Sequence, residues 1–158
     1  MKLLGSKERV GVNIVKVDTS NGIYGKVILF LDSFMLGSSD EYINLNAFIS
    51  QLQRLERSSI RLPYLRQLTD EEAFMTILES KEEIYDQCIL SLGESFDDFE
   101  IRFYDNESGI RVMWKMVSDP YFDYPFRIDS KIRGVLLTRN EISELNKLLI
   151  KEVNSFRR

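Results

Sequence analysis

The apolar positions in the N-terminal part of the chain follow a β pattern. Residues 10–17 and 23–31 are rich in β-branched and aromatic side chains, and D-T-S-N-G between them supplies positive φ at Asn21 or Gly22. These stretches predict a β-hairpin. The second stretch is apolar on both faces, which predicts a central strand with both faces covered.

Three stretches carry apolar residues at the three- and four-residue spacing of amphipathic helices. The first covers about residues 44–57, and the second begins after Thr69, where Glu72 completes a capping box. The third begins after Thr138, with Glu141 in the same arrangement. The apolar stripe of this terminal helix consists of Ile142, Leu145, Leu149, Val153 and Phe156.

The remaining apolar positions alternate with a period of two. Residues 84–92 predict a strand, residues 99–104 and 110–117 a second hairpin with one apolar face, and residues 132–137 a last short strand. The prediction is therefore an α+β fold: an antiparallel or mixed sheet of about six strands built from two hairpins. Two central helices and a C-terminal helix pack on this sheet.

Length and composition place the chain among ordinary globular proteins. With 158 residues, 44% of them hydrophobic and 29% charged, residues 1–158 are expected to form one domain. The longest apolar run, 27–31, is too short for a membrane span, and the charged start does not fit a signal peptide, so we expect a cytoplasmic protein without membrane contact. Cys88, the only cysteine, lies in the run C-I-L-S-L and predicts a buried, inert thiol.

The sequence has no histidine, which removes the commonest general base and metal ligand. Asp97 and Asp98, with Glu94 and Glu100, would be the candidates for acid–base chemistry or a magnesium site. Adjacent residues of a strand point to opposite faces, so the two aspartates share a site only within a loop. No glycine-rich phosphate loop occurs. We interpret the chain as a non-enzyme without cofactor or metal.

The net charge of −4 hides an uneven distribution along the chain. Residues 70–107 hold thirteen carboxylates against two basic residues, whereas the flanks are net positive, +3 over residues 1–69 and +4 over residues 108–158. A surface of one sign attracts a partner of the opposite sign and repels nucleic-acid phosphates. The distribution favours a basic protein partner over nucleic acid.

The segment S-D-P-Y-F-D-Y-P-F-R-I-D-S, residues 118–130, is predicted to be a loop because its two prolines donate no ladder hydrogen bond. Its aromatic side chains either fold back as a lid on the sheet or anchor a partner, with the aspartates pairing to a basic rim. The candidate partner-binding residues are Glu94, Asp97, Asp98, Asp119, Tyr121, Phe122, Asp123 and Tyr124.

The stretch L-G-E-S-F-D-D-F-E-I-R-F-Y, residues 92–104, is followed by I-R-V-M-W-K-M, the aromatic loop and a terminal strand and helix. Together with G-I-Y-G-K-V-I-L-F-L-D, residues 22–32, this order resembles bacterial polymorphic-toxin immunity proteins, including those of contact-dependent growth inhibition. The resemblance implies a non-catalytic cytoplasmic protein that binds the C-terminal domain of a cognate toxin, in many cases a basic nuclease. Binding would occlude the active site or substrate groove of the toxin.

Two other functions fit the composition. One is an acidic secretion chaperone or adaptor, which would be dimeric and would mask a partly unfolded exported partner. The other is an enzyme that uses carboxylates alone and would need one with an abnormal pKa in a cleft. The oligomeric state of an immunity protein stays open at this point.

Overall fold

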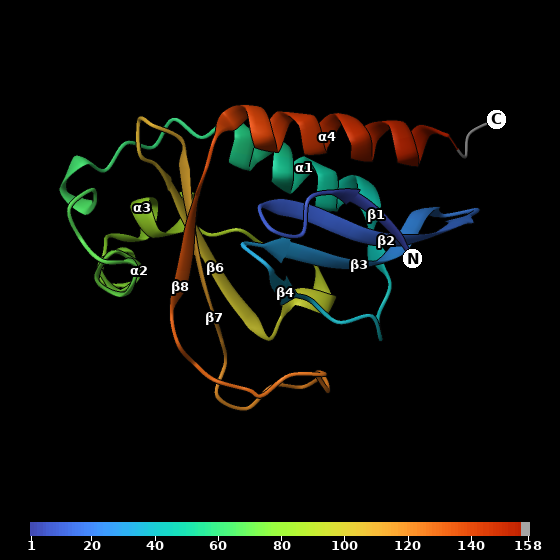
Figure 1. Cartoon of the computed structure of the whole chain (residues 1–158), viewed down its shortest axis with the longest axis horizontal. Helices are drawn as coiled ribbons and strands as arrows, with labels where there is room; N and C mark the ends of the chain where they lie inside the picture. Colours follow the sequence, from blue (N-terminus) through green and yellow to red (C-terminus); the bar gives the residue numbers. More distant parts are fainter. Residues whose placement is uncertain (156–158) are drawn as a thin grey trace.

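The strands divide between two antiparallel sheets (Figure 1) in the computed structural model, which describes residues 1–155. The first sheet has the order β1-β2-β3-β4, with β5 also paired to β3; its strands are β1 Lys2–Gly5, β2 Val10–Thr19, β3 Gly22–Leu31, β4 Phe34–Leu36 and β5 Ile43–Asn44. The second has the order β6-β7-β8, with β6 Phe99–Asp105, β7 Ile110–Met116 and β8 Arg133–Leu137. The predicted α+β class is confirmed, with two sheets in place of one.

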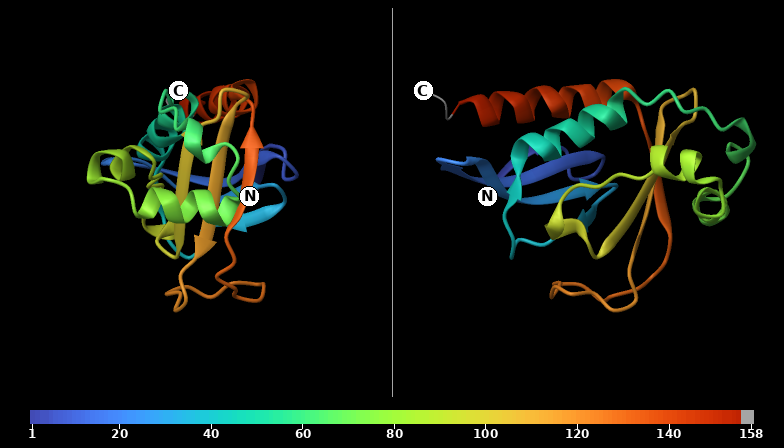
Figure 2. Two further views of the ribbon diagram at one scale, coloured as in Figure 1. Left: turned by 90° about the vertical axis from the view of Figure 1, so that its left-hand side faces the viewer. Right: turned by 180° about the vertical axis from the view of Figure 1, so that it is seen from behind.

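The helices cover both sheets. They are α1 Leu45–Glu56, α2 Asp70–Leu78, α3 Glu82–Gln87 and α4 Arg139–Asn154, with short 3-10 turns η1 Pro63–Leu65 and η2 Glu94–Phe96. Helices α1 and α4 lie on one face of the first sheet, and α2 and α3 lie beyond the second sheet (Figures 1 and 2). The long loop between β7 and β8 extends from the edge of the molecule that lies opposite α1 and α4 (Figure 1).

The predicted first hairpin is confirmed as β2 and β3, which pair from Val10 with Leu31 to Thr19 with Gly22. Strand β3 lies centrally, because it also pairs with β4 and β5. Ile28 and Phe30 on its second face are buried as well. Both faces of this half of β3 are therefore covered, as its two-sided apolar pattern predicts.

The predicted helix starts are confirmed by their caps. Asn44 accepts a hydrogen bond from the Ala47 amide at the start of α1, and Thr69 accepts one from Glu72 at the start of α2. Thr138 and Glu141 form the full capping box of α4. The predicted stripe of α4 is buried as far as Val153, and Phe156 lies outside the described residues.

The predicted strand over residues 84–92 is wrong in its first half, which forms helix α3. Ile84 and Cys88 are four residues apart, and this spacing lies on one face of a helix as well as on one face of a strand. After Cys88 the chain does run beside β6: the Leu90 amide donates to the Ile101 carbonyl at 3.0 Å. The alternating apolar pattern of this segment therefore corresponds to pairing with β6 only after the end of α3.

The second sheet separates two cores. Its inner face packs against the first sheet and α1 through Phe99, Trp114 and other side chains of β6 and β7, whereas Tyr104 and Met113 on its outer face pack against α2. Cys88 is buried in this smaller core, where burial raises the pKa of its thiol to about 11. The prediction that this thiol is buried is confirmed, and its raised pKa disfavours the reactive thiolate.

The turn between β3 and β4 is strained. Asp32 (φ 48°) and Ser33 (φ 70°) are both left-handed, the geometry of a type I′ turn, although neither is glycine. Their amides donate to the carbonyls of Arg9 and Lys7 at 2.9 and 2.8 Å, so the loop between β1 and β2 holds the turn in place. The turn fixes the direction in which Phe34 leaves it.

Replacing Ser33 by glycine is expected to raise the free energy of unfolding by about 1 kcal/mol, because glycine adopts this φ without steric cost. Urea unfolding measures the change. Ser39→Gly is the matched control, since Ser39 is exposed but has no positive φ, and it should bring no gain. Equal stability of the Ser33 variant and the wild type would contradict strain in the turn.

Candidate functional site

Asp98 attaches the long loop to the body of the protein. Its side chain is buried just before β6, and its carboxylate accepts hydrogen bonds from the amides of Tyr121 (2.7 Å) and Phe122 (2.9 Å) and from the Tyr124 hydroxyl (2.7 Å). The amide of Val117 also donates to the Asp98 carbonyl at 2.9 Å. The start of the loop is therefore fixed to β6 by one residue.

The charge of Asp98 is retained inside this arrangement. Burial raises the pKa of the carboxyl, but the hydrogen bonds from Phe122, Tyr121 and Tyr124 outweigh burial and leave the pKa below its ordinary value. The pKa of the Tyr124 hydroxyl is raised, by burial, by its hydrogen bond to Asp98 and by the nearby charge of Asp40. Asp98 is an ionised acceptor and Tyr124 a neutral donor at neutral pH.

The aromatic side chains of the loop fall into two groups. Tyr124 folds back on the main core, where its ring meets Phe99 edge-on with the centroids 5.5 Å apart. Tyr121 points outward and is 85% exposed, with Phe122 edge-on beside it at 5.0 Å. The loop is thus both a lid, through Tyr124, and an exposed aromatic surface, through Tyr121.

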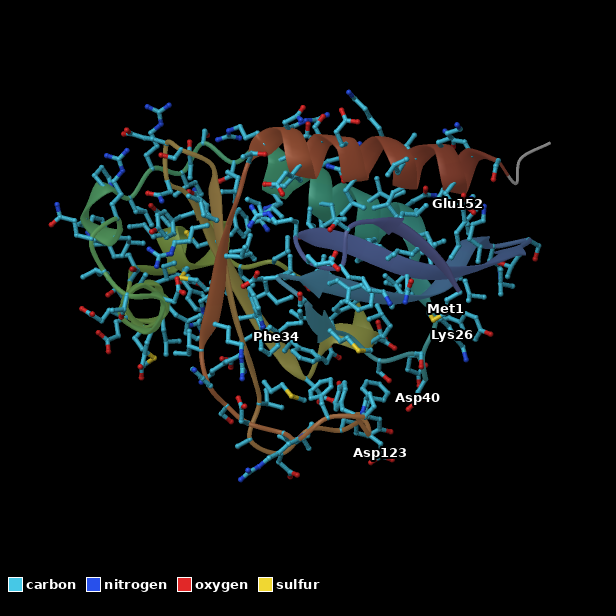
Figure 3. The ribbon with its side chains drawn as sticks, viewed as in Figure 1. Met1, Lys26, Phe34, Asp40, Asp123 and Glu152 are labelled. Carbon is cyan, nitrogen blue, oxygen red and sulfur yellow. The ribbon has the colours of Figure 1, made fainter. Side chains whose placement is uncertain are left out.

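A second loop, residues 37–42, lies against η2. The amide of Ser38 donates to the Ser95 carbonyl at 2.8 Å, and a Cβ on Gly37 would come within 2.8 Å of the Phe96 ring. This loop carries Asp40, whose exposed, negatively charged carboxylate contributes to the raised pKa of the Tyr124 hydroxyl. Asp40 and Asp123 lie at the same edge of the molecule in Figure 3.

Three loops thus present exposed carboxylates near the contact between Asp98 and Tyr124, and we name this surface the acidic loop face. Its acidic residues are Asp40, Glu94, Asp97, Asp119 and Asp123. Within residues 1–155, no lysine or arginine forms an ion pair with any of the five. The pKa of Asp97 is raised by burial and by the charges of Glu94 and Asp98. Such crowding of like charges favours binding of a cation or a basic group.

The rest of the acidic segment lies elsewhere. Asp70, Glu100, Asp105 and Glu107 form ion pairs with basic residues, and the Arg111 guanidinium donates to Asp70 at 2.7 Å. Exposed carboxylates of α2 and α3 lie beyond the second sheet, away from the long loop (Figure 2). The charge excess of residues 70–107 therefore splits between two surfaces, and the acidic loop face holds only part of it.

The structure brings the predicted site residues together, but not in equal roles. Asp98 is buried and holds the loop by hydrogen bonds, so it is not available to a partner. The side chains of Glu94, Asp97, Asp119, Asp123 and Tyr121 are exposed. Sequence reasoning missed Asp40, because it lies outside the acidic segment; its position in the turn-forming run L-G-S-S-D was the available signal. Within the described residues, no three acidic or cysteine side chains are placed to hold a metal ion.

The comparisons with known proteins agree with this fold. CdiI from Burkholderia dolosa AUO158 has a similar solved structure, with a TM-score of 0.65 and 15% sequence identity over 96% of this chain and 99% of that one. No curated protein matches the chain. No helix within residues 1–155 has the length and apolar character needed to cross a membrane. The sequence profile described as Immunity protein 42 matches residues 1–152, and the chain therefore belongs to the Imm42 family of immunity proteins.

Proposed function

We propose that this protein binds the cognate toxin domain at the C-terminus of a contact-dependent growth inhibition protein and blocks its active site or substrate groove. The observation that carries the proposal is the acidic loop face, a set of exposed carboxylates that form no ion pair with a basic residue within residues 1–155. The immunity-protein family supports a toxin as the partner, and the fold shared with CdiI supports the growth-inhibition system.

The chemistry of this face favours a basic toxin of the nuclease type. A nuclease holds the phosphates of its substrate with lysine and arginine side chains, and the same side chains pair with clustered carboxylates. Binding a basic group beside Asp97 would relieve its repulsion by Glu94 and Asp98. The face would therefore compete with nucleic acid for the groove of the toxin.

The proposed inhibition is by occlusion and needs no catalysis by this chain. Two observations support a binding role for the site. The sequence has no histidine, and Asp98 is occupied by hydrogen bonds that hold the loop. Tyr121 supplies a largely exposed aromatic side chain in the same loop as Asp119 and Asp123, and aromatic side chains are common interface hot spots. The carboxylates of the face would fix the orientation of the toxin.

Co-expression with the C-terminal domain of a candidate cognate toxin tests the proposal. We expect that domain to stop growth alone, and this protein to restore growth and form a stable complex with the folded domain. If the domain is harmless, or is bound only when unfolded, the proposal fails and the chaperone alternative replaces it. Size-exclusion chromatography of the complex and hydrogen exchange of the bound domain distinguish these outcomes.

A further inference from the structure

An apolar pocket of about 310 Å³ opens between the two sheets and the far end of the long loop. Its floor is made by Phe99, Trp114 and Met116, which are all at least 92% buried. Its walls include Phe34 of β4 and Phe126 of the loop, which remain 40% and 38% exposed. Two large aromatic side chains thus stay in contact with solvent around an apolar cavity.

Two arginines line the pocket: Asp129 neutralises Arg133, whereas Arg127 has no ion pair among the described residues. Arg133 donates two hydrogen bonds to Asp129, at 2.9 and 3.0 Å, which lower the pKa of that carboxyl to about 2. The same guanidinium lies 4.2 Å from the centroid of the Phe34 ring. Asp129 and the Phe34 ring already occupy Arg133, and Arg127 would repel a second cation. The apolar floor therefore suits an uncharged group rather than a lysine or arginine side chain.

A continuous chain of side-chain contacts connects the pocket with the acidic loop face. The rings of Phe126 and Tyr124 lie 5.4 Å apart, Tyr124 packs on Phe99 in the pocket floor, and its hydroxyl binds Asp98. A partner that covers the acidic loop face is thereby brought to the mouth of the pocket. The strained turn at Asp32 and Ser33 fixes Phe34 on the opposite wall.

We infer that the pocket receives one aromatic or long aliphatic side chain of the toxin domain, from a segment with lysine or arginine residues beside it. The inference rests on the proposed function. A volume of about 310 Å³ is at the low end of ligand pockets and matches one side chain rather than a cofactor. The flanking basic residues follow from charge complementarity with the acidic loop face.

Phe34→Ala tests the wall of the pocket. We expect the dissociation constant of the complex with the purified toxin domain to rise roughly 30-fold, the size of a hot-spot effect. Tyr64→Ala is the matched control, because Tyr64 is a 54% exposed aromatic residue on η1, on the side of α2, and should change the constant less than about threefold. Thermal unfolding of both variants verifies that they fold.

Trp114 gives a direct readout, since it is the only tryptophan of the chain. With 5-fluorotryptophan incorporated there, the protein shows one fluorine resonance, which should shift when unlabelled toxin domain is added. A stable complex with an unshifted resonance and an unaffected Phe34→Ala variant would overturn the pocket assignment and leave the proposed function standing. The absence of any complex would overturn both.

Discussion

Replacing Asp97, Asp119 and Asp123 together by lysine is expected to weaken binding of the cognate toxin domain by about 100-fold or more. All three carboxylates are exposed on the acidic loop face, and no described basic residue pairs with them. Lysine at these positions would place like charges against the basic groups proposed for the toxin, and such a juxtaposition costs several kcal/mol. Isothermal titration calorimetry at two salt concentrations measures the loss.

The control is a second triple variant that has the same net charge but carries its substitutions on another surface. Replacing Glu79, Glu83 and Asp86 by lysine reverses three exposed carboxylates on and beside α2 and α3, and both variants change the net charge by six units, from −4 to +2. If overall charge alone attracts the toxin, both variants lose the same affinity. A specific contact at the acidic loop face predicts that the control loses far less, and equal losses would refute that contact.

Asp98→Ala is expected to lower the free energy of unfolding by about 3 kcal/mol, because the amides of Tyr121 and Phe122 and the hydroxyl of Tyr124 lose a buried, charged acceptor. Since folding lowers the pKa of Asp98, its contribution is fully present above the unfolded pKa of about 3.9. The contribution is lost as the pH falls through the folded pKa. Urea unfolding at several pH values measures both effects.

Asp123→Ala separates this role from that of an exposed neighbour, since Asp123 lies in the same loop and should change stability by less than about 0.5 kcal/mol. In the Asp98→Ala variant, amide hydrogen exchange should become faster at Tyr121 and Phe122 in particular. Unchanged exchange at these two amides would show that Asp98 does not hold the loop. Tyr124→Phe, which removes one donor and keeps the ring on Phe99, should cost only part of the effect.

Local patterns were enough to predict most of the secondary structure. The β2–β3 hairpin, the caps at Thr69 and Thr138 and the apolar stripe of α4 depend on neighbours within a few residues. The partition of the strands into two sheets depends on pairing across long sequence distances, which alternation does not encode. Helix α3 was missed because Ile84 and its C-cap residue Cys88 lie four residues apart, a spacing that fits both a helix and a strand.

The candidate site shows the same limit. Composition and charge pointed to the residues around Asp97 and Tyr121, but a run of carboxylates does not reveal which one is buried. Asp98 differs from Asp97 by one position, and only the folded loop makes it an internal acceptor. The contribution of Asp40 and the pocket beside Trp114 arise from segments far apart in the chain.

Two of the three hydrogen bonds to the Asp98 carboxylate come from main-chain amides, at residues 121 and 122. Every amino acid except proline supplies such a donor, so the attachment to Asp98 does not depend on which side chains the loop displays there. Residues 119, 121 and 123 can therefore be exchanged for others while the loop keeps its course. A library of variants at these three positions is expected to keep the scaffold, and would test whether these positions set the choice of toxin.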